Sequence, residues 1–381
     1  MLVSRFPFPL EKGDKLRAYH QLRELSQTYS ITLFALSDHP IKEAHLSEVE
    51  QYCSAVIVHS QSLLQKTIGL FRSWTNGHPF QTGYFYSYRA HKQLRELIQS
   101  EKFDHIYCQL VRMSEYVKDE HRVRKTLDYM DALSAGIERR ITAQPWWKKW
   151  LFKIESRRLK VYEGRMFDFF ENRVIISEQD RALIHHPDIE QIYCVPNGIS
   201  EFFFESVDVE KTHDFVFVGN MSYPPNVEAV AYIADHILPH FPEKKLLISG
   251  SSPSLRVKRL AETNASIELT GWVDDIRTSY SRAHIFLAPM MIGTGMQNKL
   301  LEAMALGVPC ITTSLANNAI KARHENEILV ANDPSEYIES IKRLTQNEQL
   351  YNELRGNARD FVRKTYTWQQ TVEQLQQLFD E

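Results

Sequence analysis

Lys299 and Glu302 have the residue types and spacing to act on an anion and a sugar. They follow the glycines Gly293 and Gly295, and on a helix residues three apart share a face. Because helix side chains lean toward the N-terminus, Lys299 is expected to point back at a phosphate held there. Glu302 is placed to accept hydrogen bonds from ribose hydroxyls. Another reading stays open: the two side chains form a solvated surface pair and the glycines serve only the turn.

The segment around this pair predicts the elements that position it. An apolar run, 283–291, ends in a Pro-Met-Met turn, and Thr294 with Gln297 forms a capping-box pattern that predicts a helix from Gly295. Gly307 fits the left-handed position that follows a helix. The first amides of a helix have no internal partner and carry partial positive charge, and glycine lets a phosphate approach them. A strand, a glycine turn and a helix start therefore predict an anion site.

Length and composition bound the possibilities. A chain of 381 residues with 43% hydrophobic and 24% charged residues is typical of a soluble protein with two domains. The net charge of −3 gives no indication of nucleic-acid binding. Apolar runs fall short of the roughly 20 residues that span a bilayer, and no leader pattern opens the chain, so a cytoplasmic location is expected. The four cysteines are far apart and the motif holds no ligand cluster, so no metal is expected.

Strand-like runs alternate with helical ones along the chain. In the first half the strand-like runs are 1–4, 30–35, 55–59, 105–110, 125–129, 174–177 and 192–195. In the second half they are 214–218, 245–249, 266–269, 285–288, 310–313 and 327–330. This alternation predicts parallel sheets in two α/β domains, with a boundary at the Pro-Asn-Gly turn 196–198. Ligands are expected at the carboxyl ends of the strands, in a cleft between the domains.

The stretch Trp146–Arg165 combines indoles with cations. Trp146, Trp147 and Trp150 stand among lysines, and the acids of the stretch are Glu155 and Glu163. Such a helix suits peripheral contact with an anionic membrane. The alternative is that the tryptophans pack on the domain while the cations extend into water.

The ordered motifs resemble those of a glycosyltransferase of the GT-B fold, and the chain is most similar to the retaining GT4 group. These motifs are 5–20, 177–180, 195–198, 217–219, 269–273 and 293–309. The resemblance implies two Rossmann-like domains facing each other across a cleft: an acceptor-side domain, 1–195, a nucleotide-sugar domain, 196–362, and a C-terminal helix, 363–381, returning to the first. It implies transfer of a sugar from a nucleotide-diphosphate donor to an acceptor hydroxyl with retention, in polysaccharide or glycoconjugate synthesis.

The resemblance also implies roles for residues. The donor is expected on Gly219, Asn220, Val273, Gly293, Thr294, Gly295, Met296 and Glu302. Lys299 is expected to serve catalysis at the diphosphate, and Gly13 to let the chain approach a phosphate or the acceptor, unless it is only a helix-start turn. Many relatives carry a histidine near 127–131, where this chain offers Asp131 as the polar residue beside the reacting sugar, or as a structural carboxylate at a strand end. The acceptor is a saccharide or a lipid-linked saccharide.

Two departures from the family pattern concern charge. Thr294 stands where a glutamate is frequent, and Asn220 where an arginine often follows the strand glycine. The missing arginine leaves Lys299 and the helix start to neutralise the leaving diphosphate, a contribution that is usually large. Arg5 and Arg17 are candidates to compensate.

Three rival functions remain at this point. A nucleotide-sugar epimerase of the same fold would turn over the donor without an acceptor. A sugar-nucleotide-binding protein without catalysis is compatible with the Thr294 and Asn220 departures. A dehydrogenase is least compatible, because no Gly-x-Gly-x-x-Gly followed by an acidic residue is present.

Overall fold

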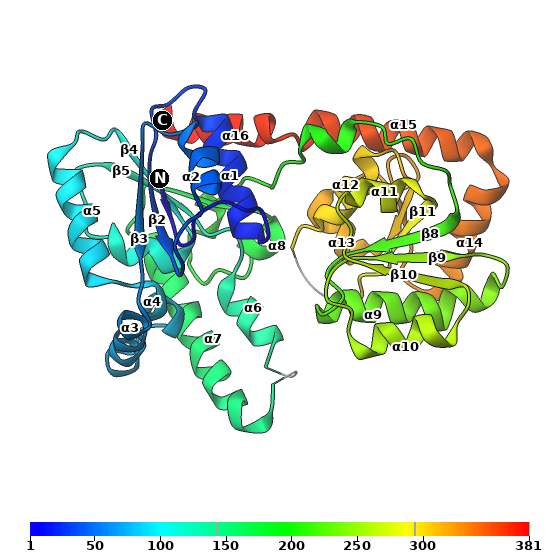
Figure 1. Ribbon diagram of the computed structural model, residues 1–381, viewed down its shortest axis with the longest axis horizontal. Helices are drawn as coiled ribbons and strands as arrows, with labels where there is room; N and C mark the ends of the chain where they lie inside the picture. Colours follow the sequence, from blue (N-terminus) through cyan, green and yellow to red (C-terminus); the bar gives the residue numbers. More distant parts are fainter. Residues whose placement is uncertain (142–143, 293–294, 381) are drawn as a thin grey trace. The chain divides into compact units, whose positions relative to one another are not determined.

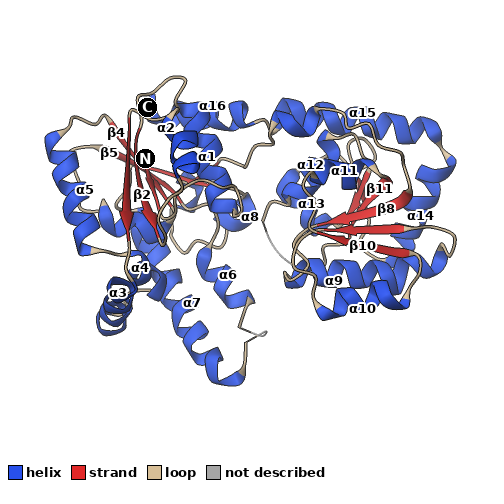
Figure 2. Ribbon diagram, viewed as in Figure 1, coloured by secondary structure: helices blue, strands red, loops and turns tan. Residues whose placement is uncertain are grey.

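The computed structural model describes residues 1–141, 144–292 and 295–380. It divides the chain into two compact units: Met1–Pro196 with the C-terminal stretch from Val372, and Asn197–Thr371. In each unit a parallel sheet lies between layers of helices (Figures 1 and 2). The predicted fold class of two Rossmann-like α/β domains is confirmed.

The sheet of the first unit has the strand order β3-β2-β1-β4-β5-β6-β7, with every pair parallel. Its strands are β1 (Leu2–Val3), β2 (Thr32–Ser37), β3 (Ala55–Ser60), β4 (His105–Gln109), β5 (Arg124–Asp128), β6 (Asn172–Ile175) and β7 (Tyr193–Cys194). The order reverses between β1 and β4. Such a switch point opens a crevice at the carboxyl ends of the two strands.

Helices cover both faces of this sheet. They are α1 (Gly13–Leu25), α2 (Glu43–Glu50), α3 (Leu63–Asn76), α4 (Phe80–Phe85), α5 (Tyr88–Ser100), η1 (Val111–Tyr116), α6 (Leu133–Arg139), α7 (Trp146–Phe167), α8 (Glu178–Arg181) and η2 (Ile189–Gln191). The helix α16 (Trp368–Asp380) joins the first unit from Val372 onward. Alternate residues of β2 enter opposite cores, as the period of a strand requires: Leu33 packs with Leu22 and Leu375, and Phe34 with Leu94 and Phe167.

The sheet of the second unit has the order β10-β9-β8-β11-β12-β13 and is also parallel. Its strands are β8 (His213–Val218), β9 (Leu246–Ser249), β10 (Ile267–Gly271), β11 (Ala283–Ala288), β12 (Cys310–Thr312) and β13 (Leu329–Val330). Its helices are η3 (Glu201–Phe204), α9 (Pro224–Tyr232), η4 (Ile233–Ile237), η5 (Leu238–His240), α10 (Leu255–Thr263), α11 (Ile276–Ser281), α12 (Asn298–Ala305), α13 (Ser314–Ile320), α14 (Pro334–Gln346) and α15 (Glu348–Thr365). Here the order reverses between β8 and β11, directly before α12.

Candidate functional site

Three glycines line the carboxyl edge of the second sheet: Gly219 and Gly250 directly follow β8 and β9, and Gly271 is the last residue of β10. The Gly219 amide donates to Ser249 O (3.0 Å), and the Gly250 amide donates to Gly271 O (2.8 Å). A Cβ at Gly250 would lie 1.8 Å from Gly219 O, and one at Gly219 would lie 2.6 Å from Asn226 Nδ2. The backbones therefore pack more closely than any other residue type permits, and this packing brings Asn226 to the end of β8.

Lys299 lies at the switch point, on the second residue of α12. Its ammonium group sits 4.7 Å from the centroid of the Phe217 ring and donates a hydrogen bond to Asn226 Oδ1. Asn226 Nδ2 in turn donates to Asn220 O (2.9 Å). Burial lowers the pKa of Lys299 to about 7, although the charge of Glu302 opposes the shift. The interpretation of Lys299 as a solvated surface cation is therefore wrong.

Glu302 lies on the next turn of α12 and is half-buried. Its Oε2 accepts a hydrogen bond from the hydroxyl of the fully buried Tyr280 (2.6 Å), which comes from α11. Burial raises the pKa of Glu302, and the Tyr280 hydrogen bond and Lys299 act in the opposite direction. Within the described part of the chain, no hydrogen bond reaches Oε1. This oxygen is placed to accept from a ligand hydroxyl.

The start of α12 differs from the prediction. The helix begins at Asn298 rather than at Gly295, because the φ of Gly295 is +94° and holds the chain in a turn that favours glycine. Gln297 occupies the N-cap position without a side-chain cap, and its Nε2 donates to Gly295 O (3.3 Å). Gly293 and Thr294, which include the other half of the predicted capping box, lie outside the described residues. The first turn of α12 therefore runs from Asn298, and its Leu300 amide donates to Gln297 O (2.9 Å).

The other predicted donor residues border this edge. Asn220 is exposed, and its Oδ1 accepts from the Ser222 amide (2.9 Å) and hydroxyl (2.7 Å), so the side chain closes its own turn. Val273 is half-buried just after β10. Met296 is half-buried and packs on the hydrophobic core of the unit. The structure thus brings Gly219, Asn220 and Lys299 together through Asn226, a residue that the sequence did not indicate.

The first unit has a charged cluster at its own switch point. Asp14 forms ion pairs with Arg5 and with Arg112, whose Nη2 lies 2.9 Å from Asp14 Oδ2. Arg112 Nε donates to Ser4 Oγ (3.0 Å). Gly13 is the first residue of α1, and a Cβ there would meet nothing within 4 Å. No steric contact with the described residues demands a glycine at this position, and the space beside it is open to a ligand.

Arg17 has a structural role. Its Nε lies 2.6 Å from Asp128 Oδ2, and both side chains are fully buried. Its Nη2 donates to Val195 O (3.0 Å) and its Nη1 to Pro196 O (3.2 Å). The guanidinium group therefore ties α1 to β5 and to the end of β7. The suggestion that Arg17 compensates for charge at a ligand is wrong.

Asp131 follows β5 at the carboxyl edge of the first sheet, the edge that also carries the Asp14 cluster. The residue before it, Met130, has a φ of +62°, an unusual conformation for a residue with a side chain. Asp131 is exposed, yet desolvation by the surrounding protein, followed by the negative charge of Asp180, raises its pKa to about 6. The exposure of Asp131 leaves its carboxylate accessible to solvent and to a ligand.

Several site residues escaped the sequence analysis. Asn226 and Tyr280 contact the predicted pair from α9 and α11, and Arg112 joins Asp14 from η1. No spacing in the sequence links them to the motif, because the strand order assembles them. No group of three or more His, Cys, Asp and Glu suited to a metal ion occurs among the residues that the structure describes.

A surface pocket of about 700 Å³ lies at the opposite edge of the second sheet. It is lined by residues at the start of β8 and β11, among them Asp214 and His284. Open α/β sheets bind ligands beyond the carboxyl ends of their strands, so this pocket is not the candidate donor site.

Sequence comparisons relate this chain to known glycosyltransferases. Residues 212–347 match the family described as Glycosyl transferases group 1. The "Uncharacterized 44.6 kDa protein in cps region" of Klebsiella pneumoniae is 25% identical over 386 residues, covering 94% of each chain. The UDP-Gal:alpha-D-GlcNAc-diphosphoundecaprenol alpha-1,3-galactosyltransferase of Escherichia coli is 25% identical over 215 residues, which are 50% of this chain and 54% of that enzyme.

Solved structures give the same indication. The structure of Anabaena Alr3699/HepE in complex with UDP and glucose superposes with a TM-score of 0.69 at 12% identity, covering 100% of this chain and 98% of the other. At this identity the likeness shows the fold, which is the GT-B fold. The family match and the fold together support a GT-B glycosyltransferase.

Proposed function

We propose that this chain transfers a sugar from a nucleotide-diphosphate-sugar to an acceptor hydroxyl. The observation that carries the proposal is the placement of Lys299 and Glu302 on one helix at the switch point of the second sheet. The ammonium group lies over the Phe217 ring and donates to Asn226, and Lys299 itself belongs to the first turn of α12. The carboxylate one turn further on has an oxygen available for a ribose hydroxyl. The UDP complex of Anabaena Alr3699/HepE supports a nucleotide donor.

The proposed chemistry depends on the charge that develops on the leaving diphosphate. Lys299 and the first amides of α12 stabilise that charge, and a preorganised group of this kind is worth most in a partly desolvated site. We propose a retaining, GT4-type reaction on a hexosyl donor, in which the acceptor attacks the same face that the diphosphate leaves and a diphosphate oxygen takes the acceptor proton. This route needs no protein nucleophile and no metal ion. Asp131 and Gly13 are proposed to serve the acceptor side.

The printed name of the Escherichia coli relative supports a lipid-linked acceptor, because that enzyme acts on a diphosphoundecaprenol-linked sugar. We propose that the reaction belongs to polysaccharide or glycoconjugate synthesis at the cytoplasmic face of a membrane, with Trp146–Arg165 in contact with anionic lipid.

A panel of UDP-, GDP- and ADP-sugars, followed by thermal melting, tests the proposal. A ligand that binds only the native state raises the melting temperature. We expect one nucleotide class to do so, and we expect Lys299→Met and Glu302→Gln to reduce the shift. Lys258→Met, at an exposed lysine of α10, is the matched control and should keep it.

Donor turnover then separates the rival functions. Release of nucleoside diphosphate that increases with added acceptor supports a transferase. Epimerised donor without release indicates an epimerase, and a thermal shift without any turnover indicates a binding protein. Equal shifts in the wild type and in both site variants would contradict the site assignment.

A further inference from the structure

Helix α3 packs with its apolar side outward. Its exposed large side chains are Leu63, Leu64, Ile68, Phe71 and Trp74, with exposed fractions from 80% at Leu63 to 49% at Trp74. The buried side of the same helix consists of Lys66, Gly69 and Ser73. A surface helix ordinarily turns its apolar stripe to the core and its polar side to water. On α3 the arrangement is reversed: the apolar side faces water and the polar side is buried.

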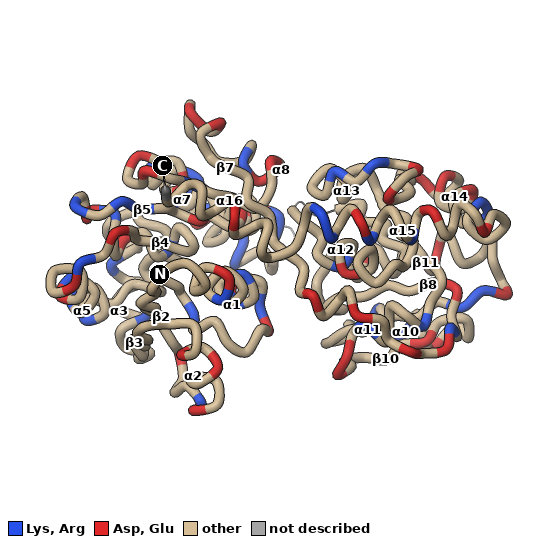
Figure 3. The backbone as a smooth tube through the Cα atoms, turned by 90° about the horizontal axis from the view of Figure 1, so that it is seen from above, with Lys and Arg blue, Asp and Glu red and all other residues tan. Residues whose placement is uncertain are grey.

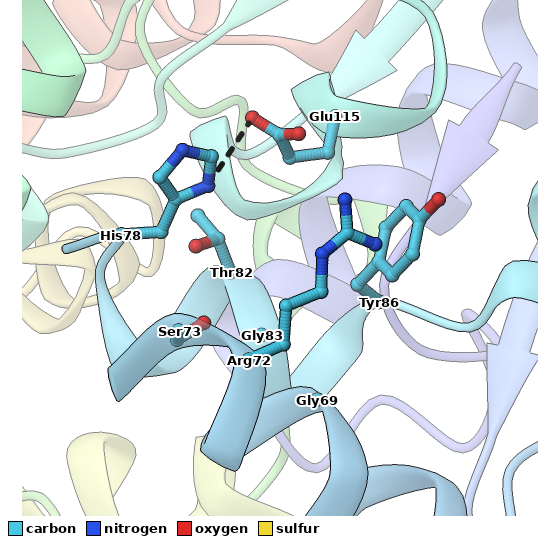
Figure 4. Close-up of a pocket in the computed structure, with 8 residues that line it drawn as sticks. All are labelled: Gly69, Arg72, Ser73, His78, Thr82, Gly83, Tyr86 and Glu115. Atoms are coloured by element: carbon cyan, nitrogen blue, oxygen red, sulfur yellow. Dashed lines mark ion pairs between the residues drawn. The ribbon is translucent and has the colours of Figure 1, made fainter. Parts of the chain in front are cut away.

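The contacts of the buried side fix this orientation. A Cβ on Gly69 would lie 2.0 Å from Gly83 O, so the backbones of α3 and α4 touch, as the close-up of this region shows (Figure 4). The ammonium group of Lys66 lies 2.6 Å from Asp38 Oδ1 and donates to the Tyr84 hydroxyl (3.0 Å). The small cavity beside these residues, about 20 Å³, holds no more than about one water molecule. The helix therefore cannot rotate its apolar face inward.

The start of α7 continues this surface. The rings of Trp74 and Trp150 meet edge to face with centroids 6.1 Å apart, and Arg158 Nη1 donates to Ser73 O (3.1 Å). Trp146 is 85% exposed, and Trp147 and Trp150 are also exposed. The alternative that these tryptophans pack on the domain is therefore wrong for Trp146. Both helices project from the same side of the first unit (Figure 1).

The charges on this α3–α7 surface have one sign. Helix α3 contains no acid, and the two acids of α7 are buried: Glu155 accepts from the Phe80 amide (2.6 Å), and Glu163 from the Ser134 amide (3.0 Å). The exposed or half-buried cations of the two helices are Arg72, Lys148, Lys149, Lys153, Arg157, Arg158, Lys160 and Arg165. Helix α14, for comparison, carries both acids and cations: Glu336 and Glu339 are followed by Lys342 and Arg343 (Figure 3).

We propose that the α3–α7 surface binds an anionic lipid bilayer. An apolar row flanked by indoles and surrounded by cations is the composition that lies in a membrane interface, with aliphatic side chains among the acyl chains and ammonium and guanidinium groups at the phosphates. In the part of the chain that the structure describes, no helix is both long and apolar enough to cross a membrane. The attachment is therefore one of surface binding, and it extends the predicted Trp146–Arg165 contact to a second helix.

Sedimentation of the full chain with vesicles tests this inference. We expect binding to vesicles that contain phosphatidylglycerol, and binding weaker by roughly tenfold or more to vesicles of phosphatidylcholine alone. The double variant Ile68→Glu, Phe71→Glu should lower the partition coefficient by about 100-fold, because two apolar side chains lose their place in the interface. Leu255→Glu, at an equally exposed leucine (74%) on α10 of the second unit, is the matched control and should bind as the wild type does.

Two further readouts complete the test. Thermal melting and nucleotide binding should be unchanged in the double variant, since both substituted side chains are exposed on the first unit. If the proposed function fails, the wild type binds no nucleotide but still binds vesicles, so the two failures are distinguishable. Sedimentation of the double variant at the wild-type level would overturn the proposal. A second result would also overturn the proposal: light scattering that shows a dimer for the wild type and a monomer for the double variant. The surface would then bind a second copy of the chain.

Discussion

Binding of a nucleoside diphosphate should be coupled to protonation of Lys299. Burial keeps the pKa of this side chain at about 7, so above pH 7 it is mostly neutral. A diphosphate placed beside it favours the charged form and returns the pKa toward its ordinary value. Binding above pH 7 therefore takes up a proton. The affinity is fully present below pH 7 and is lost as the pH rises.

The size of the effect follows from the two pKa values. If the bound pKa returns to the ordinary 10.5 and the free value is about 7, Kd increases roughly 25-fold between pH 6.5 and pH 8.5. At pH 7.5 about three quarters of the free protein carries a neutral Lys299, so each binding event takes up about 0.8 proton.

Isothermal titration calorimetry in buffers with different ionisation enthalpies measures this proton uptake directly. The ligand is the nucleoside diphosphate that gives the largest thermal shift. Lys299→Arg is the control: arginine stays charged at all these pH values, so its Kd should vary little with pH and its proton uptake should be close to zero. A wild-type protein that takes up no proton at pH 7.5, or a Lys299→Arg variant with the wild-type pH profile, would refute the reasoning.

Five other perturbations have definite expected results. Glu302→Gln should weaken nucleotide binding by about 1.5–3 kcal/mol through the lost charged acceptor, and Tyr280→Phe should lower the free energy of unfolding by a similar amount; calorimetry and urea unfolding measure the two. Arg17→Met should lower the free energy of unfolding by about 3–5 kcal/mol, because Asp128 is left buried and unpaired, without a change in nucleotide Kd below the melting temperature. Gly219→Ala should displace the Asn226 amide and weaken binding by roughly 10- to 100-fold in the same titration. A chelator should leave the rate of sugar transfer unchanged, and loss of activity that added divalent ions restore would contradict the metal-free mechanism.

The fold could be predicted because its signals are local. Each strand is a short apolar run with a turn behind it, so the run 245–249 corresponds closely to β9 (Leu246–Ser249). The start of α12 could not be placed, because the capping pattern competes with the left-handed backbone at Gly295. Helix α3 shows that a tertiary contact can override a local pattern. Its apolar spacing is that of a core helix, and the tight contact of Gly69 with Gly83 turns that face outward.

The sequence predicted the residues of the candidate site that lie on α12. Lys299 and Glu302 both lie on α12, so their spacing was sufficient to predict that one helix positions them. Asn226 and Tyr280 reach them from other elements, which only the strand order brings close. Arg17 was misjudged for the same reason: its partner Asp128 is distant in the sequence, and their pairing depends on the packing of α1 against the sheet.

A crystal structure of the chain with the preferred nucleoside diphosphate tests the central claim most directly. The account predicts that the diphosphate lies within hydrogen-bond distance of Lys299 Nζ and of the first amides of α12, and that a ribose hydroxyl donates to Glu302. A nucleotide bound elsewhere, with Lys299 still donating to Asn226, would contradict it.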